Sequence, residues 1–547
     1  MEDKIRRLAI INAVEHDGRA EMNSVLGRLI AEDPSIKSKI KTLMPEIEKI
    51  VEEVNSMGRT DQEYMIEKLK ITIRKEKKEE RHELPELPNS KMRKVVTAFP
   101  PEPGKYPHLG HAKSALINFA YAKKYKGRFV LRFEESNPEV AKKEYYKAVM
   151  DGLKWLGIKW DEIDYLSDHL PEYYKAIEKL VKTGNAYVCV CSQEKIKENR
   201  ASGSECPCRS RPEKANLELW QRMLKDAKEG EAIVRMKIDM KSENTVMRDP
   251  SIARINEKPH PRTGKKYRVW PTYDLGTSML DAWEKVTHRF RTKEFELRKD
   301  LQVYILKKLG FKPPEIMEIG RFQIKDAIIQ GREIRDGIER KIFSGWDDPR
   351  LATLVAIKRR GFEPEAIKEF LMSTGATKTE SVYEWQVIEA FNRKHIDPVS
   401  DRYFGVLDPV KVKIDGLPKD DLDVQTRPGS KKTRKIPVKS ESVFIDKEDE
   451  RELRDKKAGL MFLCTANFGE VKRFVSRSVS QDTPKIHWVG EDNVKIRIFM
   501  PDGTVAEGVG EPSLKNLKVD QTIQFYRVGF CRVDKIGKEV TFYFAHK

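Results

Sequence analysis

Apolar residues are spaced in three different ways along the chain, and each spacing predicts a different kind of structure. In residues 1–92 they recur at helical spacing, as at Ile5, Leu8 and Val14. In the middle of the chain, short apolar runs alternate with helical stretches, which is typical of α/β domains. From about residue 399, short runs rich in β-branched and aromatic residues are separated by Gly, Asp and Pro, which predicts β-barrels. Because 547 residues are too many for one core, we expect a multidomain α/β protein.

The clearest α/β unit lies between residues 95 and 136. Residues 95–99 predict a buried parallel strand, and a Pro/Gly-rich turn follows at residues 100–107. A helix is expected from His108, and a second strand at residues 129–133, so the segment is a βαβ unit. Further predicted elements are a helix at 138–156, a helix at 163–184 and a strand at 186–190.

The first 92 residues are a separate unit of three or four predicted helices without catalytic residues. The unit ends in the charged, proline-marked linker KEKKEERHELPELPN. A charged helical face is usually only solvated, and contact with RNA or with a protein partner is the open alternative.

Charge and composition narrow the class of protein. Lysine and arginine exceed the acidic residues by 105 to 87, which gives a net charge of +18. Such a surplus suits a polyanionic partner, although a heavily charged, solvated surface explains it equally well. We find no signal peptide, no apolar run near the roughly 18 residues of a membrane span, and no cysteine pattern of a secreted protein. We therefore expect a cytoplasmic protein.

Four of the six cysteines are clustered as CxC–x14–CxC. Four thiolates in two close pairs can surround a tetrahedral metal ion, and Zn²⁺ suits such a set best. Four protein ligands leave no open position for water, so this site would be structural. Two incidental pairs, or reactive thiols, are the alternatives. The predicted ligands are Cys189, Cys191, Cys206 and Cys208.

The start of the helix at His108 is the best candidate for chemistry. A helix start offers unpaired backbone N–H groups and the positive end of a dipole, which suits a phosphate. Gly110 has no Cβ, so a base or ribose can lie against the backbone, while His108 and His111 can donate to phosphate oxygens. Taken alone, HxGH is more simply an ordinary turn with two hydrogen-bonded histidines.

The complete string FPPEPxxYxHLGHAKSALINFAYA resembles the HIGH motif of class I aminoacyl-tRNA synthetases, in the glutamyl and glutaminyl group of archaeal and eukaryotic type. The resemblance covers about residues 95–547. It implies ATP-dependent attachment of glutamate to tRNA-Glu, and in some relatives to tRNA-Gln, through glutamyl-adenylate. It also implies a Rossmann-like class I catalytic core with C-terminal β-barrel anticodon-binding domains. Archaeal relatives often carry an N-terminal helical extension as well.

This resemblance divides the chain into six regions. They are the N-terminal helical extension (1–92), the first half of the Rossmann-like catalytic domain (93–186), an acceptor-end insertion with the zinc module (187–268), the second half of the catalytic domain (269–337), a helical connector that contacts the tRNA stem (338–398) and the β-barrel anticodon-binding region (399–547). In the last region the basic loop SKKTRK can bind phosphate.

The segments RFEESNP, PTYD and VTHRFRTKE resemble the family's substrate-binding stretches. They imply substrate-binding roles for Pro100, Glu102, Glu134, Tyr273 and Arg291, ATP-binding roles for His108, Gly110, His111, Glu294 and Ile329, and catalytic roles for His108, His111 and Arg332, with Mg²⁺ accompanying ATP. Glutaminyl relatives carry a cysteine at the position of Arg291, and an arginine favours an acidic side chain. A glutaminyl ligase is therefore the weaker alternative.

Two positions depart from the family pattern. The arginine expected before the PPEP segment is Ala98 here, so Arg291 or Lys113 would have to replace it. The KMSKS-type loop is expected at residues 326–337, but its Ser-Lys is Gln330-Gly331, which leaves Arg332 or Lys325 as the cation for the triphosphate. The second departure supports another alternative, a tRNA-binding paralogue with impaired catalysis.

Overall fold

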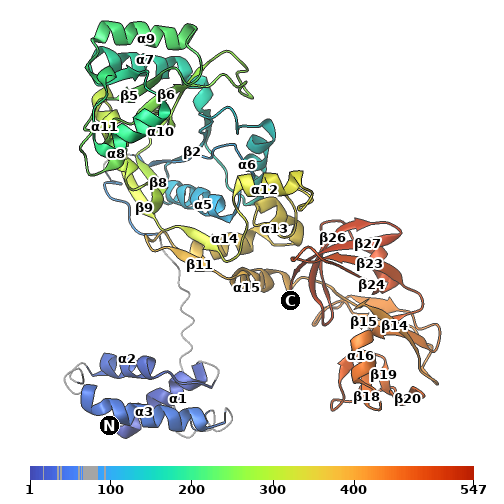
Figure 1. Ribbon diagram of the computed structural model, residues 1–547. Coiled ribbons are helices and arrows are strands. Elements are labelled where there is room, and N and C mark those ends of the chain that lie inside the picture. Colours follow the sequence, from blue (N-terminus) through green and yellow to red (C-terminus); the bar gives the residue numbers. More distant parts are fainter. Residues whose placement is uncertain are drawn as a thin grey trace. The chain divides into compact units, whose positions relative to one another are not determined.

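The computed structural model describes residues 1–15, 18–33, 36, 40–58, 62, 65, 84–91 and 94–547 (Figure 1). The chain forms two compact units, Met1–Arg81 and His82–Lys547. In the described part of the first unit, α1 (Glu2–Glu15), α2 (Met22–Glu32) and α3 (Ile40–Ser56) bury a common apolar core, which confirms the helical prediction. Residues 66–83, which include part of the linker and could hold a fourth predicted helix, lie outside the described residues.

The second unit begins with a parallel sheet. The pairing order is β1-β2-β3, and β8 pairs in parallel with β9. The backbone N–H of Thr287 donates to the carbonyl of Val96 at 2.9 Å, which places β8 beside β1. The combined order is therefore β3-β2-β1-β8-β9, and it reverses between β1 and β8. Ligands of such sheets bind beyond the carboxyl ends of the strands at this reversal. The strands are β1 (Val96–Phe99), β2 (Arg128–Phe133), β3 (Glu162–Tyr165), β8 (His288–Thr292) and β9 (Glu315–Ile319).

Helices connect and cover these strands. Helix α5 (Leu109–Lys124) connects β1 to β2. It buries Leu109, Ala112 and Leu116 in a core that it shares with Phe99 and Phe129. The other helices of this part are α6 (Lys143–Trp155), α7 (Leu170–Lys182), α10 (Tyr273–Trp283), α11 (Arg298–Leu309) and α12 (Gly331–Glu339). None of the described helices is long and apolar enough to cross a membrane.

Three segments differ from the elements expected from the sequence. The helix expected at 138–156 begins only at Lys143, because the N–H of Lys142 is bound to the carbonyl of Pro103 in the preceding turn. The helix expected at 163–184 starts as strand β3, because its first residues pair with β2, and α7 begins beside Pro171. The loop expected at 326–337 becomes helical at Gly331.

An antiparallel sheet with the order β4-β5-β6-β7 is inserted between the two halves of the parallel sheet. Its core, which includes Val188, Trp220 and Trp270, continues into residues of α7, α10 and α11. The insertion is therefore packed against helices that precede it and follow it in the chain. Its elements are β4 (Ala186–Cys189), α8 (Gln193–Ser202), α9 (Glu213–Lys225), β5 (Ile233–Met236), β6 (Ser251–Ile255) and β7 (Val269–Pro271).

A helical segment leads from the parallel sheet to the C-terminal strands. The buried guanidinium of Arg360 donates to the carbonyl of Ala545 at 2.7 Å, and Asn392 lies 3.0 Å from the ring of His546. These contacts tie the connector to the last strand of the chain. The elements are β10 (Phe322–Ile324), α13 (Leu354–Arg360), α14 (Pro364–Ser373), β11 (Ser381–Tyr383) and α15 (Trp385–Ile396).

The C-terminal region forms two β-barrels, as predicted. The larger has the strand order β12-β25-β26-β27-β23-β24-β13. Its two outermost strands follow each other in the chain, so residues 402–407 pair with β25 and then with β24 and close the ring. The strands are β12 (Arg402–Tyr403), β13 (Gly405–Leu407), β23 (Val494–Phe499), β24 (Val505–Gly510), β25 (Thr522–Phe525), β26 (Gly529–Ile536) and β27 (Glu539–His546).

The smaller barrel joins two sheets, β14-β17-β22 and β20-β19-β18-β21. The chain passes directly from β21 to β22 on one side, and Asp415 forms a bridge with Arg473 on the other. Phe404, Val412 and Trp488 lie in its core. The elements are β14 (Pro409–Lys413), β15 (Leu422–Gln425), β16 (Thr433–Ile436), β17 (Ser442–Asp446), α16 (Lys447–Glu452), β18 (Lys457–Leu460), β19 (Cys464–Asn467), β20 (Arg473–Ser476), β21 (Lys485–Ile486) and β22 (Val489–Gly490).

The contact between β1 and β8 gives a stability prediction. The buried hydroxyl of Thr287 accepts from the N–H of Val96 at 2.8 Å, so Thr287→Val leaves that N–H without an acceptor at nearly constant volume. We expect the free energy of unfolding of the catalytic part to fall by about 1–3 kcal/mol, measured by urea denaturation. The exposed Thr379→Val is the matched control and should change it by less than about 0.5 kcal/mol. Equal effects of the two substitutions would contradict this role of Thr287.

Candidate active site

Two histidines form the start of α5, at the carboxyl end of β1. His108 caps the helix: its Nδ1 accepts from the N–H of Gly110 at 3.1 Å, and the His111 Nδ1 accepts from the N–H of His108 at 3.3 Å. The ring centroids are 4.0 Å apart. A Cβ on residue 110 would lie 2.9 Å from the His108 ring, so glycine is required for this folded-back conformation.

The caps determine the protonation of both rings. A neutral imidazole accepts at one nitrogen and donates at the other, so each Nε2 carries the proton and is available to a ligand. Desolvation, the neighbouring ring and the charge of Lys105 lower the pKa of His108 well below its usual value. Desolvation, together with Lys105, lowers the pKa of His111 to about 3. Both rings are therefore neutral hydrogen-bond donors at physiological pH.

A small cavity of about 260 Å³ opens beside the histidines. Lys105 lies between the turn and the opposite loop, with its ammonium 3.4 Å from the His108 Nε2 and 3.2 Å from the Ile329 carbonyl oxygen. The Arg335 guanidinium donates to the carbonyl of Gly104 at 2.6 Å. The lining residues are Glu102, Gly104, Lys105, His111, Val140, Gly331, Arg332 and Arg335.

A network of buried charges lies at the carboxyl ends of β2 and β8. Arg132 contacts Glu134 at 3.0 Å, Asp281 at 2.9 Å and Glu284 at 3.0 Å. Arg289 also pairs with Asp281. Burial raises the pKa of Glu284 to about 8 despite the nearby Arg132. With Glu284 protonated, the charges of Arg132 and Arg289 balance those of Glu134 and Asp281.

Arg291 and Tyr273 belong to the edge of this network. The Arg291 Nη2 donates to the Thr277 hydroxyl at 2.6 Å and lies 3.9 Å from a Glu134 carboxylate oxygen. Its guanidinium lies 5.7 Å from the centre of the Tyr273 ring. The buried Arg291 Nε and Tyr273 hydroxyl have no protein partner among the described residues. These two groups can therefore bind a polar ligand.

The structure brings together most of the residues singled out in the sequence. Glu134, Tyr273 and Arg291 meet at one network, and Glu102 and His111 line the cavity. His108 and the Ile329 carbonyl both contact Lys105, and Pro100 is half-buried directly after β1. Glu294 is exposed and accepts from the Thr292 hydroxyl at 3.0 Å. The Arg332 side chain lines the cavity mouth but is 90% exposed.

The two lysines that the sequence suggested as replacements both contact other groups in the structure. Ala98 packs in an apolar cluster with Val130 and Val286. The Lys113 ammonium lies 5.3 Å from the Phe322 ring, while Lys325 is exposed and pairs with Glu384 at 2.9 Å. Beside Glu134 the second cation is Arg132, which the sequence analysis missed. A charged residue inside the apolar strand RFVLRF was the signal that could have found it.

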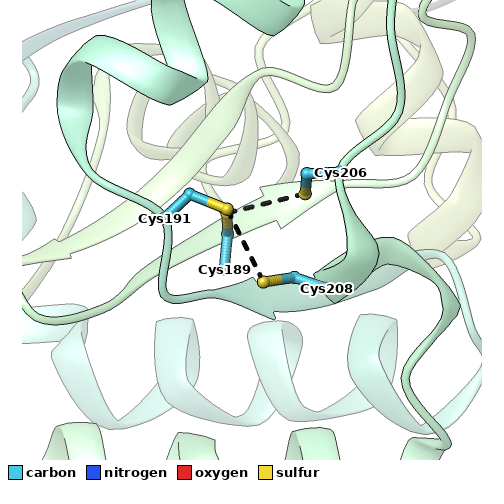
Figure 2. A group of neighbouring side chains, drawn as sticks. All are labelled: Cys189, Cys191, Cys206 and Cys208. Atoms are coloured by element: carbon cyan, nitrogen blue, oxygen red, sulfur yellow. Dashed lines mark hydrogen bonds between the residues drawn. The ribbon is translucent and has the colours of Figure 1, made fainter.

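The four clustered cysteines are free thiols that point toward one another (Figure 2). The Sγ atoms of Cys189 and Cys206, and those of Cys191 and Cys208, are 3.8 Å apart, and all four lie within 4.8 Å of one another. Tetrahedral Zn²⁺ with bonds of about 2.3 Å requires sulfur atoms separated by about 3.8 Å. The Arg211 Nη2 lies 3.6 Å from the Cys208 sulfur and would stabilise a thiolate. The donor set therefore fits zinc.

Sequence comparisons agree with this fold along most of the second unit. Residues 94–398 match the model for tRNA synthetases class I (E and Q), catalytic domain. Residues 400–483 and 485–534 match the two models for the anti-codon binding domain of the same synthetases. A parallel sheet with histidines at its reversal point, followed by these domains, defines a class I tRNA synthetase.

Curated relatives match nearly the whole chain. Glutamate–tRNA ligase from Pyrococcus horikoshii is 39% identical, over 98% of this chain and 98% of that protein. The enzyme of the same name from Pyrococcus abyssi is 38% identical, over 99% of both chains. That from Korarchaeum cryptofilum is also 38% identical, over 100% of this chain and 99% of the other. The protein belongs to the E and Q family of class I tRNA synthetases.

Proposed function

We propose that this protein is a glutamate–tRNA ligase that attaches glutamate to tRNA-Glu in the cytoplasm, with ATP as the second substrate. The observation that carries the choice of amino acid is Arg291, a nearly buried guanidinium at the edge of a network whose other charges are balanced, with an Nε that no described protein group contacts. The near full-length similarity to proteins named glutamate–tRNA ligase supports it. A glutaminyl ligase would need a neutral site at the same place.

The reaction would take place in two steps. An oxygen of the α-carboxylate of glutamate attacks the α-phosphorus of ATP. The bond between this phosphorus and the oxygen that bridges to the β-phosphate breaks, and glutamyl-adenylate and pyrophosphate result. A hydroxyl of the terminal tRNA ribose then attacks the glutamyl carbonyl and displaces AMP. Mg²⁺ bound with ATP would neutralise part of the phosphate charge.

The residues of this chain supply positioning and charge. The His108 and His111 Nε2–H groups would donate to phosphate oxygens as negative charge moves onto pyrophosphate. Glu134 would bind the substrate ammonium, and Arg291 would bind the side-chain carboxylate, beside Tyr273. Because both carboxylate and arginine are largely removed from water, their attraction is stronger than at the surface. Neither step needs a covalent enzyme intermediate.

Charging of tRNA tests the proposed function. Unfractionated archaeal tRNA should accept labelled glutamate in an ATP-dependent reaction, and should accept labelled glutamine at least about 100-fold more slowly. Sequencing of the charged species shows whether tRNA-Gln is a second acceptor. His111→Ala should slow adenylate formation about 100-fold and leave the Kd for tRNA within about twofold.

The control variant is His395→Ala, which removes a half-buried histidine that pairs with Glu369 on the connector. It should leave activation within about threefold of wild type. If neither amino acid is attached while tRNA still binds, the protein is a non-catalytic tRNA-binding paralogue, and the proposed function is wrong.

Specificity for glutamate should depend on Arg291. Arg291→Gln removes the charge that faces the substrate carboxylate and leaves Glu134 with one cation fewer. We expect kcat/KM for glutamate to fall at least about 30-fold, because a buried charge pair loses about 2 kcal/mol or more when one partner is truncated. The exposed Arg321→Gln should leave kcat/KM unchanged. Wild-type kcat/KM in Arg291→Gln would exclude a contact with the substrate carboxylate.

We further propose that the four cysteines hold a structural Zn²⁺. The purified protein should contain about one zinc ion per chain by mass spectrometry, and Cys206→Ser should lose it and lower the Tm of the insertion. Cys464→Ser, at a buried cysteine in the smaller barrel, should retain the metal. A metal-free wild-type protein with unchanged Tm after chelation would show that the thiols pack without an ion.

A further inference from the structure

The loop that follows β10 contains Gln330-Gly331 at the place where the family resemblance implies Ser-Lys, so the cation for the triphosphate would have to come from elsewhere. Among the described residues near this loop, Arg332 is 90% exposed and Lys325 pairs with Glu384 outside the cavity. Arg335 is held by the carbonyl of Gly104. Lys105, from the turn after β1, is the lysine that lines the cavity in the described residues 94–547.

The Lys105 ammonium lies next to the ring N–H donor of His108. The His108 ring already accepts the N–H of Gly110 at Nδ1, so its Nε2 carries a proton. This N–H lies 3.4 Å from the Lys105 ammonium, and two donors at that distance have no acceptor between them. An anionic oxygen placed there would accept from both groups at once.

Lys105 also contacts residues 329–331 of the loop that follows β10. Its ammonium donates to the carbonyl of Ile329 at 3.2 Å. A Cβ on Gly331 would lie 3.0 Å from both the Cβ and the Cδ of Lys105, so the aliphatic part of the lysine passes over a residue without a side chain. The first residue of α12 therefore has no side chain at the place where a lysine of the turn crosses it.

We propose that Lys105 is a catalytic residue of amino acid activation, which contacts the β- or γ-phosphate of ATP and replaces the lysine missing from residues 329–332. The inference rests on the proposed function, because it assigns a role within that reaction. The ammonium stabilises the charge that pyrophosphate acquires as its bond to the α-phosphorus breaks. The turn rather than the loop then supplies the charge, next to the two histidine donors.

The first test compares Lys105→Met with Lys325→Met, which removes the exposed lysine of the neighbouring segment. Lys105→Met should lower kcat for glutamate-dependent ATP–pyrophosphate exchange, measured with tRNA present, about 100-fold. It should weaken ATP binding at least about 10-fold in calorimetry and leave adenosine binding within about twofold. Lys325→Met should leave all three values unchanged.

A second variant separates the charge from its position. The double substitution Lys105→Gly with Gly331→Lys moves the ammonium from the turn to the loop and removes the overlap between the two side chains. The double variant should regain at least a tenth of the ATP–pyrophosphate exchange activity that the single variant Lys105→Gly loses. This rescue is not expected if Lys105 only supports the structure of the turn.

The outcomes are distinguishable. Exchange by Lys105→Met within about threefold of wild type would overturn the proposal, and so would an equal loss of adenosine and ATP binding. If wild type binds ATP but never attaches glutamate, the proposed function fails. A selective loss of ATP binding in Lys105→Met would still establish the phosphate contact in that case.

Discussion

The structure depends on the neutralisation of Arg132. A guanidinium that is 0% exposed on an inner strand of the sheet costs several kcal/mol unless carboxyl groups that accept its hydrogen bonds surround it. Two of those partners, Asp281 and Glu284, come about 150 residues later in the chain, from α10 and its end. Their pairing fixes α10 against β2 across the inserted domain. It thereby determines where the neighbouring Glu134 and Arg291 lie, and with them the proposed amino acid site.

Much of this architecture could be predicted from the sequence, and the exceptions have physical causes. The strand at residues 96–99, the helix that begins after His108 and the change to β-structure near residue 400 follow from apolar spacing and turn residues, and the structure confirms them. Strand β3 was missed because pairing with β2, a long-range contact, overrides its local preference. Family motifs located His111 and Arg291. The contacts of Arg132 and Lys105 were missed because both link segments that lie far apart in the chain.

The two sites at the sheet reversal use opposite electrostatic designs. At the start of α5, desolvation keeps the histidines uncharged, so they act as donors with fixed directions, and Lys105 supplies the net charge beside them. At the carboxyl ends of β2 and β8, four or more charged groups are buried together, and the balance is set by whether Glu284 holds a proton. The proposed reaction matches this difference, because ATP carries phosphates whereas glutamate carries two carboxylates and an ammonium.

The strand pairing that closes the two barrels limits where the chain can be cut into separate fragments. The matches to the two anti-codon binding models meet between residues 483 and 485, yet β21 and β22, at residues 485–490, complete the ring of the smaller barrel. Residues 402–407 likewise close the larger barrel, while Phe404 within them packs in the core of the smaller one. A fragment cut at that junction would expose unpaired strand edges on both sides, which favours aggregation. The two regions matched by these models therefore form a single folding unit.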